Sequence, residues 1–133
     1  MAELQCIVVT PEQTVRDTPA DFVALTLLDG EIGIAPGHTP LIGRLGFGEM
    51  RIRRDNEVAR YYVEGGFVEV VGNVVSVLTQ RAIAAGSLDE AVARERLLDA
   101  EGRPATTPEL MAVRDRTEAQ SRAQLRVARR ARE

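Results

Sequence analysis

Hydrophobic positions alternate with polar ones along the first 84 residues of the chain. In Met50-Arg51-Ile52-Arg53 the apolar and charged residues take turns, which is the period of a strand with one face in a core and one in water. Turn-forming pairs such as Gly72-Asn73 separate the alternating runs. The pattern predicts strands at residues 4–9, 22–28, 47–54, 58–64, 67–71 and 74–79.

The predicted strands are short and regularly separated by turns, which favours an antiparallel sandwich or a flattened barrel. One strand departs from the alternating pattern. Residues 74–78 are apolar at odd and even positions alike, so we expect this strand to be buried on both faces.

Residues 29–41, DGEIGIAPGHTPL, combine three glycines and two prolines with a short apolar run. Glycine allows positive φ or a close backbone approach, whereas proline fixes φ and lacks a donor. We therefore predict a specifically folded connection rather than a strand or a helix. It is either a shape-determining pair of turns or a loop that carries function. Ile32, Ile34 and Leu41 are expected in a core, and Glu31 and His38 at its rim.

The hydrophobic period changes after Gly86. Ser87 is a candidate N-cap, with Asp89 and Glu90 in the first helical turn, where the helix dipole favours acids. This helix is expected to end at Gly102, and Pro104 prevents its resumption. Thr106 and Glu109 have the spacing of a capping box and predict a second helix that continues to the C-terminus.

The short connection between the two helices predicts an antiparallel α-helical hairpin over residues 86–133, after a β-sandwich domain over residues 1–85. The second helix has few large apolar residues among its arginines and glutamines. At about 25 cal/mol per Å² of apolar surface, such a stripe supplies only a few kcal/mol of docking energy. Two interpretations stay open: a stabilising appendage, or a hairpin that a partner can displace.

Composition indicates a single ordinary domain, or a small domain with an appendage. The chain has 133 residues, of which 44% are hydrophobic and 28% charged. No apolar run approaches the ~18 residues of a membrane span, and the sequence begins with neither a secretory leader nor a transit peptide. We expect a protein free in the cytosol or on the cytosolic side of a membrane.

Charge is distributed unevenly along the chain. Residues 1–86 hold eleven acids and seven arginines, whereas the last fifteen residues hold five arginines and one acid. A basic tip suggests an acidic partner. Nucleic acid is not favoured, because the rest of the chain offers neither a basic face nor stacking aromatics.

Residues that carry covalent or metal chemistry are scarce. His38 is the only histidine, and the sequence contains none of the common nucleophile, phosphate-loop or zinc motifs. Cys6 is the only cysteine, which excludes disulfides and cysteine metal sites and leaves it the role of a small buried hydrophobe. We predict no catalytic residues and no metal.

Three motifs occur in order along the chain. Val9-Thr10-Pro11-Glu12 is followed by GEIGIAPGHTPL over residues 30–41 and by YVEGGFVEV over residues 62–70, before the helix pair. Over nearly the whole chain, this series resembles the epsilon subunits of bacterial F-type ATP synthases. The resemblance implies a flattened antiparallel β-sandwich with a C-terminal helical hairpin. It also implies a non-catalytic central-stalk subunit that couples rotation of the c-ring to the catalytic head during ATP synthesis.

The resemblance also implies partners and contact residues. The sandwich would bind the gamma subunit and the c-ring, with Glu31, Gly33, Pro36, Gly37 and His38 in the contact loop. The hairpin would extend into the head of alpha and beta subunits and inhibit ATP hydrolysis. Its contact residues there would be Arg122, Arg126, Arg129 and Arg130, facing an acidic segment of the beta subunits. The chain would be a monomer when isolated and, in the complex, peripheral to the cytoplasmic face of the bacterial inner membrane.

One position departs from the family's ATP-binding motif. Leu88 and Asp89 match the motif, but Val92 stands where the motif has an arginine. Because an apolar side chain cannot pair with phosphate, we predict weak or absent ATP binding, with Asp89 as the single nucleotide candidate and no other cofactor. Two other hypotheses remain: a standalone module whose basic C-terminal helix engages an acidic partner, and a small enzyme.

Overall fold

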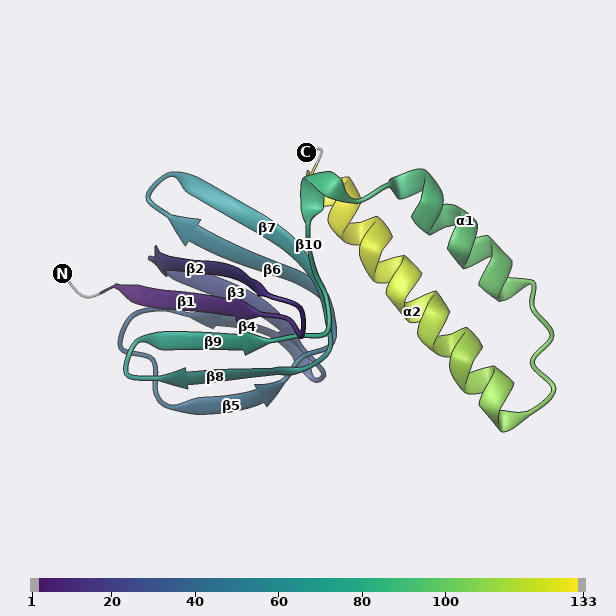
Figure 1. The fold of residues 1–133 in the computed structure, drawn as a ribbon, viewed down its shortest axis with the longest axis horizontal. Coiled ribbons are helices and arrows are strands. Elements are labelled where there is room, and N and C mark those ends of the chain that lie inside the picture. Colours follow the sequence, from purple (N-terminus) through teal and green to yellow (C-terminus); the bar gives the residue numbers. More distant parts are fainter. Residues whose placement is uncertain (1–2, 132–133) are drawn as a thin grey trace.

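The computed structural model describes residues 3–131 and arranges them as two stacked sheets followed by two helices (Figure 1). The first sheet has the strand order β2-β1-β9-β8-β5 and the second β10-β7-β6-β3-β4. Among the described strands, β1 and β9 pair in parallel and the other neighbours are antiparallel. The strands are β1 (Leu4–Val9), β2 (Thr14–Ala20), β3 (Phe22–Leu27), β4 (Gly30–Ile34), β5 (Leu41–Arg44), β6 (Phe47–Arg54), β7 (Glu57–Glu64), β8 (Phe67–Val71), β9 (Val74–Leu78) and β10 (Ala82–Ala84).

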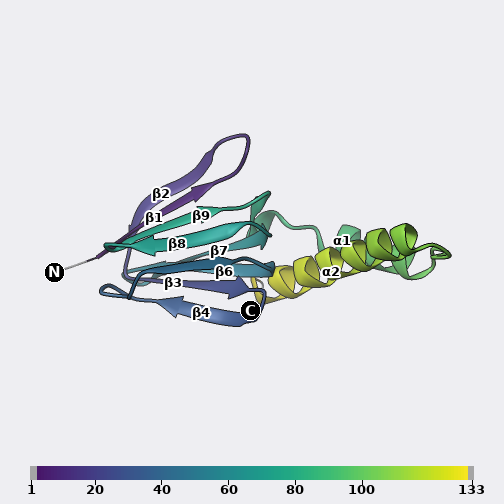
Figure 2. The ribbon, with the colours of Figure 1, turned by 90° about the horizontal axis from the view of Figure 1, so that it is seen from below.

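The core lies between the two layers, which Figure 2 shows one above the other. Every second residue of each central strand points inward, as the alternation predicts: Val68 and Val70 do so on β8, and Met50 and Ile52 on β6. Cys6 is fully buried, and its burial raises the pKa of the thiol to about 12. The sandwich is thus confirmed, with Cys6 as an unreactive core residue.

The segment at residues 29–41 differs from its prediction. Gly30–Ile34 forms strand β4 at the edge of the second sheet, and Leu41–Arg44 forms β5 at the edge of the first. Gly33 lies within β4, where a Cβ would be 2.5 Å from the Phe22 ring, so the missing side chain makes room for that ring. Ile34 is buried as predicted, whereas Ile32 and Leu41 are only half-buried.

A tight turn connects β4 to β5. The His38 amide donates to the carbonyl of Ala35 (3.1 Å), with Pro36 and Gly37 between them. Gly37 has φ +85°, which the third residue of a type II turn requires. The Gly37 amide also donates to Oδ1 of Asn73 (2.7 Å), in the turn between β8 and β9. The chain therefore passes from one sheet to the other through a short, pinned turn.

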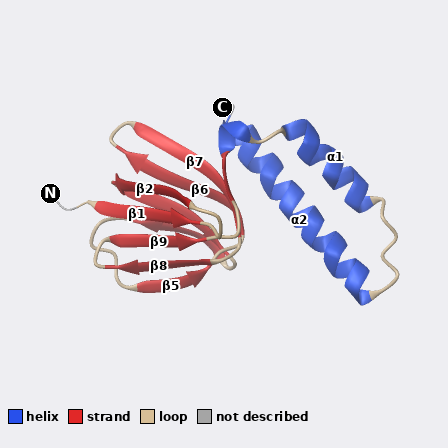
Figure 3. Ribbon diagram, in the orientation of Figure 1, coloured by secondary structure: helices blue, strands red, loops and turns tan. Residues whose placement is uncertain are grey.

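The two helices form the predicted antiparallel hairpin (Figure 3). A 3₁₀ turn, η1 (Ala85–Ser87), precedes α1 (Glu90–Glu101) and α2 (Pro108–Ala131). Helix α1 ends before Gly102, as predicted.

Both predicted N-caps are wrong. Asp89, not Ser87, caps α1: its Oδ1 accepts from the Val92 amide (3.1 Å). Thr107, not Thr106, caps α2, because Pro108 with its fixed φ takes the first helical position and the Leu110 amide donates to Thr107 Oγ1 (3.1 Å).

The prediction for β9 is also wrong. Val75 and Val77 lie in the core, but Val74 and Leu78 point outward and are exposed. The hairpin extends from one end of the sandwich and leaves the outer face of the first sheet without a covering helix (Figure 2). The second face of β9 is therefore apolar without being buried in this chain.

Candidate partner-binding surfaces

The C-terminal half of α2 packs on the outer face of the second sheet. Ala123 and Val127 contact Tyr62 on β7 and Ala85 in η1, and Phe47, Ile83 and Leu88 surround this small cluster. The loop between α1 and α2 points away from the sandwich (Figure 1). The hairpin is therefore docked by one end of one helix, over the limited apolar surface that its sequence predicts.

Polar groups beneath α2 are satisfied within the chain. The Tyr62 hydroxyl donates to Glu64 Oε1 (2.7 Å), and the buried Gln124 on α2 also hydrogen-bonds to Tyr62. The Glu64 amide in turn donates to Thr79 Oγ1 (3.1 Å). Burial, followed by the adjacent Glu64, raises the pKa of the Tyr62 phenol well above its ordinary value. A neutral phenol thus connects α2 to the sheet.

Glu49 on β6 is a buried carboxylate at this interface. Its side chain is 6% exposed and accepts from three arginines: Arg51 Nη1 at 2.8 Å, Arg60 Nη1 at 3.3 Å and Arg130 Nη1 at 3.2 Å. Arg51 also donates through Nη2 to Glu31 on β4 (2.6 Å). The Glu49 hydrogen bond, more than any other effect, raises the pKa of the Arg51 guanidinium. Sequence reasoning missed this cluster, because Arg130 follows Glu49 by 81 residues.

The four arginines singled out in the sequence occupy two places. Arg126, Arg129 and Arg130 line one cleft of about 390 Å³ between α2 and the second sheet, together with Glu31 and Glu49. Arg129 pairs with Glu90 at the start of α1 (3.0 Å). Arg122 lies apart and pairs with Glu118 and Glu101 (3.6 and 3.7 Å).

The five residues of the predicted contact loop are also divided. Glu31 and Gly33 belong to β4, with Glu31 at the hairpin end of the strand, where it meets Arg51. Pro36, Gly37 and His38 form the turn beyond the other end of β4. His38 is half-buried, with Nδ1 2.7 Å from the carbonyl oxygen of Thr39. The structure therefore joins Glu31 to the hairpin and separates it from the turn.

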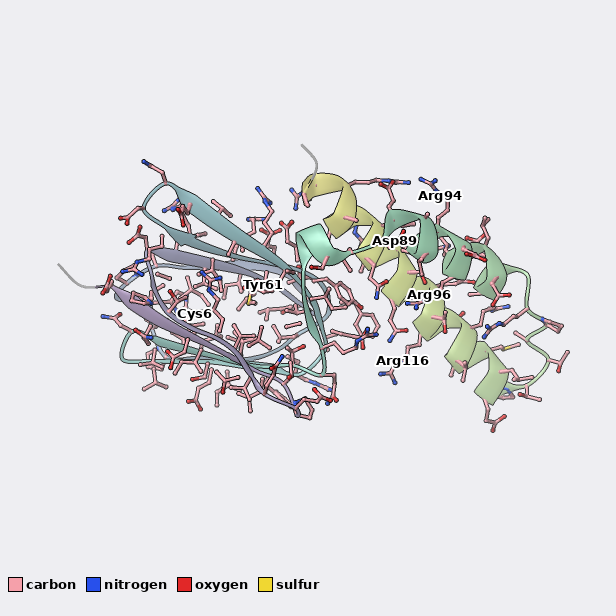
Figure 4. The ribbon with its side chains drawn as sticks, turned by 45° about the horizontal axis from the view of Figure 1, so that its top comes forward. Cys6, Tyr61, Asp89, Arg94, Arg96 and Arg116 are labelled. Carbon is pink, nitrogen blue, oxygen red and sulfur yellow. The ribbon has the colours of Figure 1, made fainter. Side chains whose placement is uncertain are left out.

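Asp89, the nucleotide candidate, lines an open cleft of about 520 Å³ between η1 and the end of α2. Its carboxylate is occupied as the α1 N-cap. Arg94 and Arg96 are the arginines that follow Val92 on α1 and could replace the missing cation of the motif. Figure 4 shows them leaving the helix on different sides, and Arg94 pairs with Glu90 (3.2 Å). Among the described residues that line this cleft there is no arginine.

The sequence analysis missed an uncovered apolar face on the outside of the first sheet. Its apolar side chains form two cross-strand pairs, Phe67 with Leu78 and Val71 with Val74, with Glu69 and Ser76 paired between them. Ile42 on β5 lies opposite Glu69 on the same face. Ile42 is 73% exposed, Phe67 51% and Leu78 53%. The sequence signal for this face was that residues 74–78 of β9 are apolar at odd and even positions alike. Patches of this kind on a single chain mark an interaction site.

Within residues 3–131, no three His, Cys, Asp or Glu side chains gather as metal ligands would, and no helix is both long and apolar enough to cross a membrane.

Comparison with known proteins decides the family. Residues 3–85 match the family model described as ATP synthase, Delta/Epsilon chain, beta-sandwich domain. The ATP synthase epsilon chain of Rhodopirellula baltica is 45% identical over 126 residues, which cover 95% of this chain and 98% of that relative. The chain belongs to the ATP synthase epsilon family. The epsilon chain of Symbiobacterium thermophilum is 41% identical over 104 residues, covering 77% of this chain and 75% of that protein.

Solved structures share the epsilon fold. A chain in the Euglena gracilis mitochondrial ATP synthase structure (OSCP/F1/c-ring, rotational state 1) superposes with a TM-score of 0.82 at 20% identity, covering 100% of this chain and 83% of that one. A chain in the Tetrahymena thermophila central stalk/c-ring structure gives 0.74 at 11% identity, covering 96% and 97%. Membership in the epsilon family makes this chain a non-catalytic subunit of ATP synthase.

Proposed function

We propose that the chain is a central-stalk subunit that couples rotation of the c-ring to the catalytic head during ATP synthesis, with the gamma subunit as its main partner. The observation that carries this proposal is the uncovered apolar face of the first sheet. The relatives are named ATP synthase epsilon chains, and one matching structure is described as a central stalk with its c-ring.

Gamma would bury the uncovered apolar face. Two apolar cross-strand pairs, Phe67/Leu78 and Val71/Val74, lie on this face on either side of the polar pair Glu69/Ser76. Arg44 lies over the Phe67 ring, 6.0 Å from its centroid. Exposed apolar side chains interspersed with a few polar groups are typical of protein interfaces. The turn at residues 36–38 is tied to Asn73 beside this face, so we assign it to the contact with gamma and the c-ring.

Mixing purified chain with purified gamma tests this surface. We expect a stable complex on size-exclusion chromatography, and its loss in the variant Leu78→Glu, which replaces a large exposed apolar side chain of the face by a charge. Val58→Glu is the matched control, since Val58 is an exposed valine on the second sheet. Absence of a complex with the unmodified chain would refute the stalk assignment, and equal binding by both variants would refute the choice of face.

We further propose that the hairpin leaves its docked position and inhibits ATP hydrolysis in the assembled enzyme. Its docking surface is small, and Arg126, Arg129 and Arg130 gather where an acidic segment of the beta subunits could replace Glu49 and Glu90. Deleting residues 87–133 is expected to raise ATPase activity of the assembled complex. Unchanged activity would make the hairpin a stabilising appendage only.

The same proposal gives the chain its cellular place. It would be held through the complex at the cytoplasmic face of the bacterial inner membrane and would be a monomer when isolated. ATP would bind weakly or not at all, because Val92 is apolar and Asp89 is occupied by helix capping.

A further inference from the structure

Glu49 marks the point where the hairpin is fastened to the sandwich. It lies on the outward side of β6 with its side chain 6% exposed. A carboxylate this enclosed needs charged or hydrogen-bonding partners. Two of its partners, Arg51 and Arg60, stand opposite each other on β6 and β7 and stay in place whenever the sheet is folded. The third, Arg130, is on α2 and leaves with the hairpin.

Glu31 belongs to the same network. Arg51 donates to Glu31 at 2.6 Å and to Glu49 at 2.8 Å, so one guanidinium bridges the two carboxylates. Glu31 also faces the cleft that Arg126, Arg129 and Arg130 line. An unbroken series of contacts therefore runs from Glu31 through Arg51 and Glu49 to Arg130.

Positive charges outnumber negative ones around Glu49, so the network needs the carboxylate of Glu31 to balance them. Three guanidiniums surround Glu49, and two more line the adjoining cleft. Arg129 in the cleft is paired with Glu90, and Glu31 supplies the second negative charge beside Glu49. When that charge is neutralised, Arg51 interacts with Glu49 alone and competes with Arg130, because both arginines donate to the same oxygen, Oε1. The guanidiniums of Arg51 and Arg130 repel each other as they approach this shared oxygen. The least constrained of these partners is Arg130.

We propose that Glu31 controls docking of the hairpin: a cationic group of a partner that engages Glu31 weakens the Arg130–Glu49 pair and releases the C-terminal end of α2. Glu31 is half exposed at the sheet edge, where such a group can reach it. The linkage between Glu31 and α2 is a property of the free chain. Its use in the assembled enzyme rests on the proposed stalk function.

Hydrogen–deuterium exchange of the full isolated chain, with α2 amides followed by mass spectrometry, tests the linkage. Glu31→Gln is expected to speed exchange over residues 119–131 by about two- to fivefold, as for the loss of a partly exposed ion pair. Glu31→Arg imitates a bound cation and is expected to have a larger effect. Glu69→Gln, an exposed carboxylate on the outer face of the first sheet, is the matched control and is expected to change nothing there.

The double variant Glu31→Gln/Arg130→Gln separates linkage from general destabilisation. Without Arg130, the Glu31 substitution is expected to have no further effect on α2. Amides of β1 and β9 report on the fold and are expected to keep their protection. Unchanged exchange in Glu31→Gln, or an effect that persists in the Arg130→Gln background, would overturn the proposal. Because gamma is absent from this experiment, the outcome does not depend on the stalk assignment.

Discussion

Arg130, one residue before the end of α2, donates to Glu49 on β6 across the boundary between hairpin and sandwich, with 3.2 Å between Nη1 and Oε1. The pair joins residues separated by 81 positions. In this docked arrangement, Arg129 and Arg130 of the C-terminal helix form ion pairs with carboxylates of the same chain, Glu90 and Glu49.

Replacing Glu49 by glutamine is expected to destabilise the protein. The substitution leaves Arg51, Arg60 and Arg130 around a neutral amide, so three charge-assisted hydrogen bonds are weakened together. We expect the free energy of unfolding in urea to fall by about 1–3 kcal/mol. Glu57→Gln, a change at an exposed position of β7, serves as control and should stay within about 0.5 kcal/mol of the parent. Equal stability of the two variants would show that the arginine cluster adds nothing to folding.

The two adjacent glycines between β7 and β8 are expected to respond differently to alanine. At Gly66 (φ +97°) a Cβ would overlap the carbonyl oxygen of Leu78, which is backbone and cannot move aside. At Gly65 (φ +69°) a Cβ would meet no described heavy atom within 4 Å. Gly65→Ala should therefore cost about 1–2 kcal/mol from its positive φ alone, and Gly66→Ala more than about 3 kcal/mol.

Thermal denaturation of both glycine variants gives the comparison. If Gly66→Ala proves as stable as Gly65→Ala, the close approach of β9 to this turn is not a constraint on the fold.

Alkaline pH is expected to destabilise the protein partly through Tyr62. Burial raises the folded-state pKa of Tyr62 above the ordinary value of 10.0, so above that pH the unfolded chain loses a proton that the folded chain keeps. The free energy of unfolding should then fall as pH rises, by up to about 1.4 kcal/mol per pH unit.

Tyr62→Phe is expected to remove this part of the pH dependence. Cys6 contributes with the same sign, because its pKa is raised from 9.0 to about 12, so some slope should persist. Urea unfolding at several values between pH 8 and 11 measures both. A Tyr62→Phe variant that keeps the full slope would contradict a buried, neutral phenol.

Isothermal titration of the isolated chain with ATP is expected to give no micromolar binding. The carboxylate of Asp89 is held by the Val92 amide, and Val92 itself offers no charge to phosphate. The variant Val92→Arg is titrated alongside it, since this substitution restores the missing cation and keeps the backbone amide that Asp89 caps. Micromolar affinity in the unmodified chain would show that other residues supply the phosphate contacts.

What the sequence predicts correctly has a common physical basis. The six predicted strands are interior strands, with neighbours on both sides and a face in the core; β6, for example, lies between β7 and β3. Burial imposes the alternation that makes them recognisable. The four strands that were not predicted, β2, β4, β5 and β10, lie at the sheet edges. Arg16, Asp17 and Pro19 are tolerated in β2 because one of its sides is unpaired.

The candidate sites were less predictable, because they depend on distant contacts. The sequence indicates a basic C-terminal helix, yet Arg130 meets Glu49 only because α2 folds back onto β6. Residues 74–78 are apolar at both parities, and that pattern was interpreted as burial within the chain, although Val74 and Leu78 face outward. Alternation identifies an apolar face without saying which molecule covers it.

The turn between β4 and β5 has a mechanical consequence. On one side it continues into β4, which is paired with β3 over five positions, and on the other into β5, which is paired with β8 over four. A pull on Pro36 or Gly37 along the strands is therefore divided between both layers and loads two ladders of hydrogen bonds in shear. Bonds loaded in shear must yield together, whereas bonds that are peeled break one after another. A force applied to this turn from outside is consequently resisted by both sheets at once.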